Sequence, residues 1–434
     1  AMGGVFILDF VKDMPISDPM GYAMRYFAQY PALALNWYLP GFYAVEATFY
    51  ALFGISESVA HWTVIFFCLL AGSAWLMWCK RSWGLPSAVL SAALFLTVPL
   101  WNFWGRSVML EAPAIAMFLL SLVFFERYLE RPELGRGVQA GLVLAAALLF
   151  KQTLALLLPA VLIYGLMTPR RAALWRPAAL PAYLCVIIAL ALIALHAVKF
   201  GNLGLTATLG DIRSETGHHA SRLSLERWLA YPKLLFGTWG WPLLAMSLLG
   251  ALLPSRDKEQ QLPMLYAWIG VWYVFMTLVM GPANGARYTL YAFPALAAFA
   301  ARPVYIFRDN KSLRHLVMAA LVGAIGLNGF RSLNQTVPYV DGYREVAEFI
   351  KTKGTSGPIM FAGKHDGSFV FHMRRLDPER NEVILRADKL LVSLAVHKYF
   401  GMQSHVSNLA EVSALLEKYN VEYVLIERPD IVDV

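Results

Sequence analysis

Two charged residues stand within apolar sequence in the stretch WNFWGRSVMLEAPAIAMFLLSLVFF, residues 101–125. Arg106 and Glu111 are five residues apart in this stretch. A charge inside a membrane span costs about 2.5–3.5 kcal/mol on insertion scales, so its presence needs a reason. A carboxylate can activate an acceptor hydroxyl or amine, and an arginine can hold a phosphate leaving group. A plain alternative is that both side chains reach the interface or pair with neighbours.

Further candidates are Lys151 in FKQT and Arg287, followed by Tyr288, in ARYTLYAFP. The first segment adds carboxylates, which are Asp9, Asp13, Asp18 and Glu46. Each has a plain interpretation: Lys151 can mark a turn, Arg287 can start a helix, and loop aspartates are usually solvated. We give the joint pattern more weight than any one residue, because carboxylates and cations together suit a reaction at a membrane boundary.

Weaker signals lie elsewhere. The adjacent His218 and His219 could touch a metal or an acceptor, but adjacent residues rarely ligate one ion, and loop polarity is the better interpretation. KHDGSF, residues 364–369, could form a ligand loop, although a plain turn explains it. Phosphate-loop, dinucleotide-binding and nucleophile-elbow motifs are absent from the sequence. The three cysteines are expected to be buried membrane residues.

The composition excludes most soluble classes. The chain of 434 residues is 58% hydrophobic and 15% charged, whereas soluble domains carry about 25% charge. Its mean hydropathy is +0.52. A net charge of +8 could suggest a nucleic-acid partner, but the basic residues cluster in short connections between apolar segments. Retention of such connections on the cytoplasmic face explains them better, so we expect a membrane protein and no nucleic acid.

The elements that must position the charged residues are apolar segments of about the length that crosses a bilayer. Ten spans are predicted, so the chain is expected to have ten or eleven transmembrane helices. They run at 59–79, 86–104, 108–126, 137–150, 152–168, 178–198, 234–253, 262–281, 288–301 and 314–330. The chain opens with AMGG, which resembles neither a signal peptide nor a natural start, so we expect upstream residues that include a first transmembrane helix.

Orientation follows from the basic residues in alternate connections. These connections hold Lys80 and Arg81; Arg127, Arg131 and Arg136; Arg170, Arg171 and Arg176; Arg256 and Lys258; and Arg302, Arg308, Lys311 and Arg314. We assign them to the cytoplasmic face. The candidate residues, the loop 199–233 and everything after about residue 330 then fall on the opposite face.

The last hundred residues differ in character. YREVAEFIKTKG and LAEVSALLEKYN predict amphipathic helices, and PIMFAG and VEYVLIE predict short strands. Alternating helix and strand predicts a small α/β domain on the external side. We therefore expect three parts: residues 1–58 as a first external segment with an acidic motif, 59–330 as the transmembrane domain, and 331–434 as the external domain.

This order of features resembles the polyprenyl-phosphate-dependent glycosyltransferases with the GT-C fold, in particular protein O-mannosyltransferases and the aminoarabinose transferase acting on lipid A. SDPMGY resembles the family's DExxY, which places Asp18 at the acidic position and Tyr22 at the tyrosine. Pro19 replaces the usual second acid, so Asp9 or Asp13 can hold the role instead. LPGFYAVEATFYALFGIS resembles a family segment that begins with a double proline. RSVMLEAP, FKQT and ARYTLYAFP supply the remaining family positions, which are Arg106, Glu111, Lys151, Arg287 and Tyr288.

The resemblance implies an inverting transfer of a sugar from an undecaprenyl-phosphate-like donor to an external lipid, protein or glycan. The acid of the first segment would be the general base, and Glu111 would orient the acceptor or the base. Arg106, Lys151 and Arg287 would neutralise the departing phosphate. Aromatic residues would stack on the sugar, with Trp37, Tyr38, Trp101 and Trp104 as candidates. The resemblance implies no assured cofactor and leaves a divalent cation as an option. The location implied is the bacterial inner membrane, with the site on the periplasmic face.

Two other classes stay open at this point. A lipid or sugar transporter would line a path to mid-bilayer with charges and would show inverted repeats, neither of which is evident here. The second class is a non-catalytic relative with an external binding domain. The departures from the family motifs at Pro19 and Gly41 leave this class open.

Overall fold

The computed structural model describes residues 1–33, 38–200, 223–256, 259–280, 285–336, 341–394 and 402–427. The predictions for Trp37, His218 and His219 concern residues outside these ranges. The chain forms two compact units that are each discontinuous in sequence. The first comprises Ala1–Leu35, Tyr43–Ala60 and Pro338–Val434, and the second comprises Asn36–Phe42 and His61–Val337.

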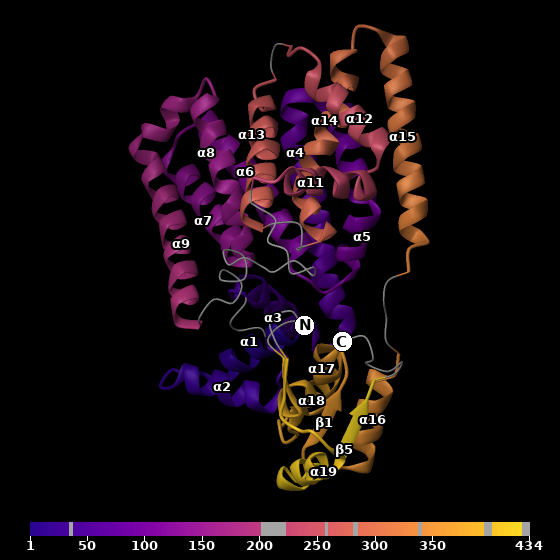
Figure 1. The fold of residues 1–434 in the computed structure, drawn as a ribbon. Helices are drawn as coiled ribbons and strands as arrows, with labels where there is room; N and C mark the ends of the chain where they lie inside the picture. The colour runs from indigo at the N-terminus through magenta and orange to yellow at the C-terminus, as the bar shows by residue number, and fades with distance from the viewer. Residues whose placement is uncertain are drawn as a thin grey trace. The chain divides into compact units, whose positions relative to one another are not determined.

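The second unit is helical (Figure 1). Its α-helices are α4 (Glu57–Thr97, which begins in the first unit), α5 (Pro99–Arg106), α6 (Glu111–Glu130), α7 (Leu134–Phe150), α8 (Leu158–Met167), α9 (Leu180–Phe200), α11 (Leu225–Thr238), α12 (Trp241–Leu252), α13 (Leu262–Phe275), α14 (Phe293–Ile306) and α15 (Lys311–Leu333). Two 3₁₀ helices matter for the site, η1 (Gln152–Leu157) and η6 (Ala286–Ala292).

Among the described residues, six helices are long and apolar enough to cross a membrane, or seven if the bent pair α11 and α12 counts as one span. This supports an integral membrane protein, as predicted, with fewer long helices than the ten predicted spans. The predicted spans 137–150 and 152–168 correspond to the shorter apolar helices α7 and η1 with α8. The predicted span 86–104 is divided between the end of α4 and the separate helix α5.

A break inside α4 separates two predicted spans. Lys80 and Arg81, which we expected in a connection, continue the helix from residue 57, and the chain leaves helical geometry at Gly84, where φ is 72°. A residue with a side chain rarely adopts this φ, whereas glycine does so readily. Pro86 follows two residues later and is suited to the start of a new helix.

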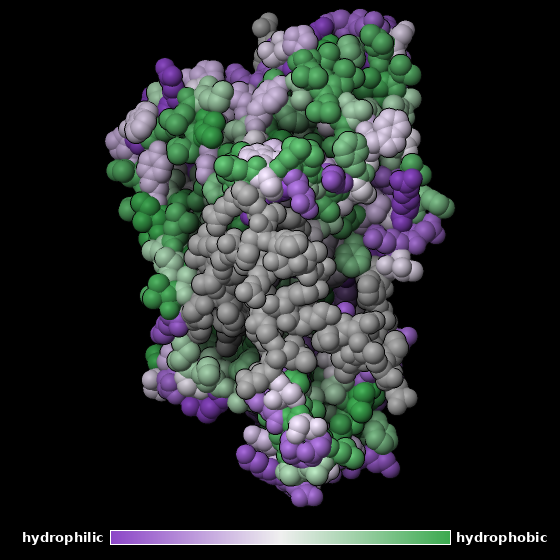
Figure 2. Space-filling model, viewed as in Figure 1, coloured by the Kyte–Doolittle hydropathy of each residue, from purple (hydrophilic) through white to green (hydrophobic). Residues whose placement is uncertain are grey.

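The core of the second unit lies around α6 and α14. In their most apolar windows, 72% and 94% of the residues are buried, against 11% for the α9 segment and 17% for α15. The exposed side chains of α9 are themselves apolar, for example Leu184, Ile187, Ile188 and Leu195. In Figure 2 the visible surface over α9 is coloured largely as hydrophobic. Such an outer face suits contact with lipid.

The first unit joins the start and the end of the chain. Its helices are α1 (Met2–Asp13), α2 (Pro19–Gln29), α3 (Gly41–Phe53), α16 (Tyr343–Lys353), α17 (Asp366–Leu376), α18 (Ala387–Leu390) and α19 (Leu409–Lys418). Strands β1 (Ile359–Ala362), β2 (Ile384–Arg386) and β5 (Tyr423–Ile426) form a parallel sheet in the order β2-β1-β5. In register, Ile359 lies beside Ile384 on one side and Tyr423 on the other. A second, antiparallel pair joins β3 (Val392–Leu394) to β4 (Met402–Ser404).

The helices and strands predicted for the last hundred residues correspond to α16, β1, α19 and β5. Ile359, Met360 and Phe361 of the central strand β1 are buried, which explains the continuous apolar run in PIMFAG.

Candidate active site

Glu111 and Lys151 form a buried ion pair in the second unit. Glu111 is the first residue of α6, where the helix dipole favours a carboxylate. Lys151 follows the last residue of α7 in an extended conformation, so the helix ends there and η1 begins. The Lys151 Nζ donates to Oε1 of Glu111 at 2.7 Å, and the side chains are 3% and 2% exposed. Two charges so far from water persist only because they compensate each other.

Arg287 adds a second cation on the same carboxylate. It lies in η6, which begins after Gly285. One terminal nitrogen of its guanidinium is 3.9 Å from Oε1 of Glu111, and its side chain is 32% exposed. The other oxygen of Glu111 is buried and accepts no hydrogen bond from the described residues. The three side chains therefore carry a net charge of +1, with one carboxylate oxygen uncommitted.

Aromatic rings surround these cations. The Lys151 Nζ lies 5.7 Å from the ring centre of Tyr288 and 5.9 Å from that of Tyr291. The Arg287 guanidinium lies 5.0 Å from the Tyr288 ring. Tyr38 is close enough to interact electrostatically with Lys151. The rings favour a cation while excluding water, which strengthens every charge interaction in the site.

Tyr291 is a member of this cluster that the sequence did not identify. A 3₁₀ helix has three residues per turn, so side chains at i and i+3 lie one above the other. Tyr288 and Tyr291 are stacked accordingly, with ring centres 6.2 Å apart. The three-residue spacing in ARYTLYAFP was the available signal, but it identifies Tyr291 only once η6 is known to be a 3₁₀ helix.

Arg106, five residues before Glu111 in the sequence, is not joined to it in the structure. It is the last residue of the short helix α5 and is half-buried. Within the described ranges it forms no ion pair, and Lys151 holds Glu111 instead. Of the predicted aromatic residues in this region, Trp101 is buried against Phe95 at 4.2 Å between ring centres, which is a core position. The buried Trp104 Nε1 donates to no acceptor among the residues that the structure describes.

The acidic residues of the first segment belong to the first unit. Asp9 is buried and accepts three hydrogen bonds from Arg374, two from a terminal nitrogen at 2.7 and 2.8 Å and one from Nε at 3.1 Å. It accepts a fourth at 2.6 Å from the Tyr26 hydroxyl. Asp13 accepts from the Tyr22 hydroxyl at 2.7 Å and pairs with Arg380. Hydrogen bonding to Arg380 lowers the pKa of Asp13.

Asp18 has a different position. Its carboxylate caps the N-terminus of α2, accepting from the Gly21 amide at 2.8 Å. Its other oxygen pairs with Arg25 at 3.1 Å, and the side chain is 56% exposed. The Gly21 amide, followed by Arg25, lowers the pKa of Asp18, so this carboxylate is charged at neutral pH. The Tyr22 hydroxyl donates to Asp13 and not to the Asp18 carboxylate, and the Tyr22 amide bonds only to the Asp18 carbonyl, at 3.0 Å.

The partners Arg374 and Arg380 were also missed from sequence. They follow Asp9 and Asp13 by 365 and 367 residues, and no local pattern marks such pairs. The segment KHDGSF, for which a plain turn was the preferred interpretation, is likewise held by distant residues. Nδ1 of His365 lies 2.8 Å from Glu427, and Asp366 pairs with Arg386 at 2.7 Å.

A divalent cation was one expectation of the resemblance. Across the part of the chain that the structure describes, no three His, Cys, Asp or Glu side chains are grouped to hold a metal. The donor set around Glu111 is one carboxylate between two cations, which does not fit a metal.

Known proteins share features with this chain. A model of the family described as dolichyl-phosphate-mannose-protein mannosyltransferase matches residues 38–198, a segment that contains Glu111 and Lys151. No curated protein sequence matches the chain. ArnT from Cupriavidus metallidurans bound to undecaprenyl phosphate has a TM-score of 0.57 at 16% identity, covering 81% of this chain and 80% of that chain.

The archaeal oligosaccharyltransferase AglB from Archaeoglobus fulgidus, in complex with an inhibitory peptide and a dolichol-phosphate, has a TM-score of 0.55 at 13% identity. That match covers 92% of this chain and 62% of AglB. The chain thus shares the fold of ArnT and AglB. These matches confirm the predicted resemblance to polyprenyl-phosphate-dependent glycosyltransferases of the GT-C fold.

Proposed function

We propose that this chain is a membrane glycosyltransferase that moves a sugar from a polyprenyl-phosphate donor to an external lipid, protein or glycan acceptor. The observation that carries the proposal is the cluster of Glu111, Lys151 and Arg287. The matches to a mannosyltransferase family and to ArnT bound to undecaprenyl phosphate support the donor class.

The two cations suit the phosphate of the donor. Arg287 is one-third exposed, and its distance of 3.9 Å from Glu111 is longer than a hydrogen bond. Lys151 already holds that carboxylate, so the donors of Arg287 are available to a second anion. The planar fork of arginine matches two phosphate oxygens at once. Lys151 is buried and adds a fixed positive charge to the same cluster. Arg106, which has no ion pair within the described ranges, is assigned to the same phosphate.

The sugar transfer is a single displacement. The acceptor oxygen or nitrogen forms a bond to the anomeric carbon while the bond from that carbon to the phosphate oxygen breaks. The proton of the acceptor goes to a carboxylate, and the electron pair of the broken bond leaves with the polyprenyl phosphate. One displacement inverts the anomeric centre. Lys151 and Arg287 stabilise the charge that builds on the phosphate as it departs.

We assign carboxylates to the steps that involve the acceptor, which are its orientation and the removal of its proton. The free oxygen of Glu111 can accept a hydrogen bond from an acceptor hydroxyl or amine and orient it. We assign the base to Asp18, because its side chain is exposed, and keep Asp9 as the alternative. Four hydrogen bonds already occupy Asp9, which makes it the less available acid. Tyr22, bonded to Asp13, is assigned to substrate binding.

The proposed site faces the outside of a bacterial inner membrane. The alternation of basic connections predicts this orientation, and the lipid-facing surface of α9 supports a membrane location.

A transfer assay tests the proposal. Membranes that contain the full chain are given polyprenyl-phosphate sugars with a radiolabel on the sugar, and labelled products are separated from the donor. We expect transfer by the natural chain and loss of transfer in Glu111→Gln. A matched control is Glu126→Gln, which changes a buried glutamate of the same helix that is hydrogen-bonded to Tyr164. Equal transfer by the natural chain and Glu111→Gln would refute the assignment.

A further inference from the structure

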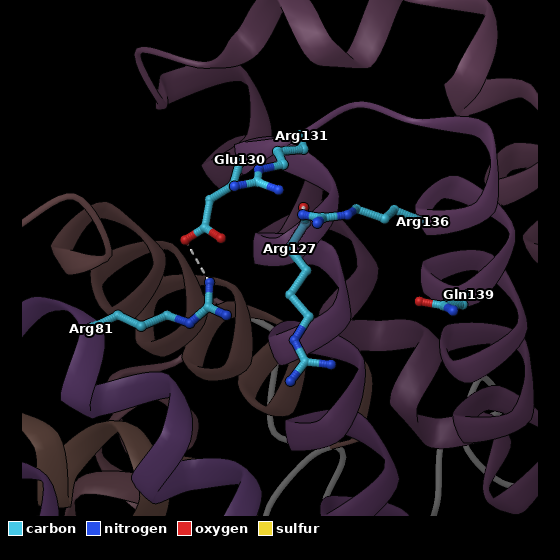
Figure 3. A pocket seen from close by; sticks show the side chains of 6 residues that line it. All are labelled: Arg81, Arg127, Glu130, Arg131, Arg136 and Gln139. Carbon is cyan, nitrogen blue, oxygen red and sulfur yellow. Dashed lines mark hydrogen bonds and ion pairs between the residues drawn. The ribbon is translucent and has the colours of Figure 1, made fainter.

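A basic pocket lies at the other end of α6 within the second unit. It has a volume of about 420 Å³ and is lined by Arg81, Arg127, Glu130, Arg131, Arg136 and Gln139. Figure 3 shows these side chains around the pocket, with the ion pair between Glu130 and Arg81 as a dashed line. We call it the arginine pocket.

Three elements build the arginine pocket where they end or bend. Arg81 lies three residues before the break of α4 at Gly84, Arg127 and Glu130 lie in the last turn of α6, and Arg136 lies in the first turn of α7. Glu111 is the first residue of α6, so 20 residues of helix, about 30 Å, separate the pocket from the proposed active site. The arginine pocket is therefore a separate place on the chain, at the level where membrane spans end.

The charges of the arginine pocket do not balance. Four arginines face one glutamate, a net charge of +3. Glu130 is committed to Arg81 at 2.6 Å and lies 4.0 Å from Arg170. The end of α6 contributes about half a negative charge, which is too little to compensate.

Two of the four arginines are especially available to bind an anion. Arg127 and Arg131 are exposed, and neither forms an ion pair within the described ranges. The Arg127 guanidinium rests 5.3 Å from the centre of the Phe124 ring, an apolar support that leaves its donors free. Arg136 partly faces Glu133 at 3.4 Å and donates to the Arg127 carbonyl at 3.0 Å, which fixes its direction.

We propose that the arginine pocket binds the phosphate group of an anionic membrane phospholipid. Guanidinium groups recognise phosphate through paired, charge-assisted hydrogen bonds, and several around one concavity relieve their mutual repulsion by binding an anion. Basic pockets between transmembrane helices at the membrane surface are typical sites for anionic headgroups. The exposed apolar helices of this unit would keep the acyl chains beside the protein.

The test measures lipid binding to the detergent-solubilised full chain by native mass spectrometry. The probes are short-chain phosphatidylglycerol, short-chain phosphatidylcholine and soluble glycerol phosphate. We expect phosphatidylglycerol to bind at least about tenfold more tightly than phosphatidylcholine, and Arg127→Gln with Arg131→Gln to raise its Kd by about tenfold or more. Thermal unfolding without added lipid checks that this double variant folds.

Two further variants separate a site from diffuse surface charge. Arg308→Gln with Lys311→Gln removes two exposed positive charges elsewhere and should leave the Kd unchanged. Glu130→Gln removes the one acidic group that lines the pocket and frees Arg81, so binding should tighten. An equal loss in both double variants, or weaker binding in Glu130→Gln, would overturn the proposal. Glycerol phosphate binding as tightly as phosphatidylglycerol would assign the pocket to a free phosphate compound and overturn the lipid assignment.

Discussion

The ammonium of Lys151 donates a 2.7 Å hydrogen bond to Oε1 of Glu111, and both side chains are almost completely buried. Neither charge could remain there alone, because an unpaired buried charge costs several kcal/mol. Arg287 approaches the same carboxylate from a partly exposed position. The buried pair of Lys151 and Glu111 is therefore fixed. Arg287, which is more exposed, can leave Glu111 and bind a phosphate instead.

Glu111→Gln should abolish most sugar transfer while leaving donor binding intact. Glutamine keeps the shape and one acceptor oxygen for Lys151, but it loses the charge that would orient the acceptor. A positioned acid or base typically contributes a factor of about 10²–10⁴, so turnover should fall by that amount. Turnover and donor binding are to be measured on the same preparation. Glu126→Gln serves as the control and should keep full turnover.

Arg287→Ala should weaken use of the donor with little effect on folding, because Glu111 keeps Lys151 as its partner. A lost charge-assisted contact costs about 1.5–3 kcal/mol, which corresponds to about a tenfold or greater loss in kcat/KM for the donor. Lys151→Ala should show that loss as well as destabilisation of about 3–5 kcal/mol, since it leaves Glu111 without its main partner. Steady-state kinetics with varied donor, beside thermal unfolding, separates the two effects. Unchanged donor dependence in Arg287→Ala would remove it from the phosphate site.

The sequence predicted the residues of this cluster better than their pairing. Charges in apolar context marked Glu111, Lys151 and Arg287, because membrane burial makes any charge conspicuous. Arg106 is the nearest cation to Glu111 in the sequence, but it is not the residue that pairs with it. The observed partner is 40 residues away, and it comes close only because α6 and α7 run back beside each other.

Long-range pairs of the first unit were beyond prediction for the same reason. Asp9 and Arg374 are 365 residues apart, and neither the acidic loop nor the C-terminal pattern indicates that they meet. Local signals did better in the last hundred residues, where apolar periodicity located α16, β1, α19 and β5. In α4, by contrast, Lys80 and Arg81 suggested a connection between two spans. Lysine and arginine are good helix formers, however, so the helix continues through them and breaks at Gly84.

Asp18→Asn and Asp9→Asn should identify the base by their different side effects. Asparagine is as good an N-cap as aspartate, so Asp18→Asn should leave α2 intact and reduce transfer about 10²-fold or more if Asp18 is the base. Asp9→Asn leaves Arg374 buried with a neutral partner and should lower stability whatever its role. Turnover normalised to folded protein is the deciding measurement. Full turnover in Asp18→Asn with none in folded Asp9→Asn would move the base to Asp9.

Acid should remove a stabilising contribution from Glu427. Burial alone would raise the pKa of this carboxyl, but hydrogen bonds from the His365 side chain and from the His365 and Lys364 amides lower it to about 2. A pKa below the unfolded value of about 4.3 stabilises the fold above that pH, and this stability is lost as pH falls towards 2.

Glu427→Gln tests this pH dependence. The natural chain should resist unfolding better than the variant at pH 6, and the difference should shrink as pH falls from about 4 through 2, because Glu427 then becomes protonated in the folded chain as well. Limited proteolysis of residues 343–427 at matched pH values measures the difference. A gap that stays constant from pH 6 to 2 would show that the Glu427 charge does not stabilise the first unit.

Cysteines introduced at Ser255 and Ser368 should react from opposite sides of the membrane. Both positions are exposed: Ser255 lies between α12 and α13 in a predicted cytoplasmic connection, and Ser368 lies in α17. The background lacks the natural cysteines Cys68, Cys79 and Cys185, which are buried or half-buried. A membrane-impermeant maleimide added to intact cells should label Ser368→Cys at once and Ser255→Cys only after permeabilisation. The cysteine-free background is the control for non-specific reaction. Labelling of both positions in intact cells would contradict the orientation, because the basic connections and the C-terminal residues would then share a face.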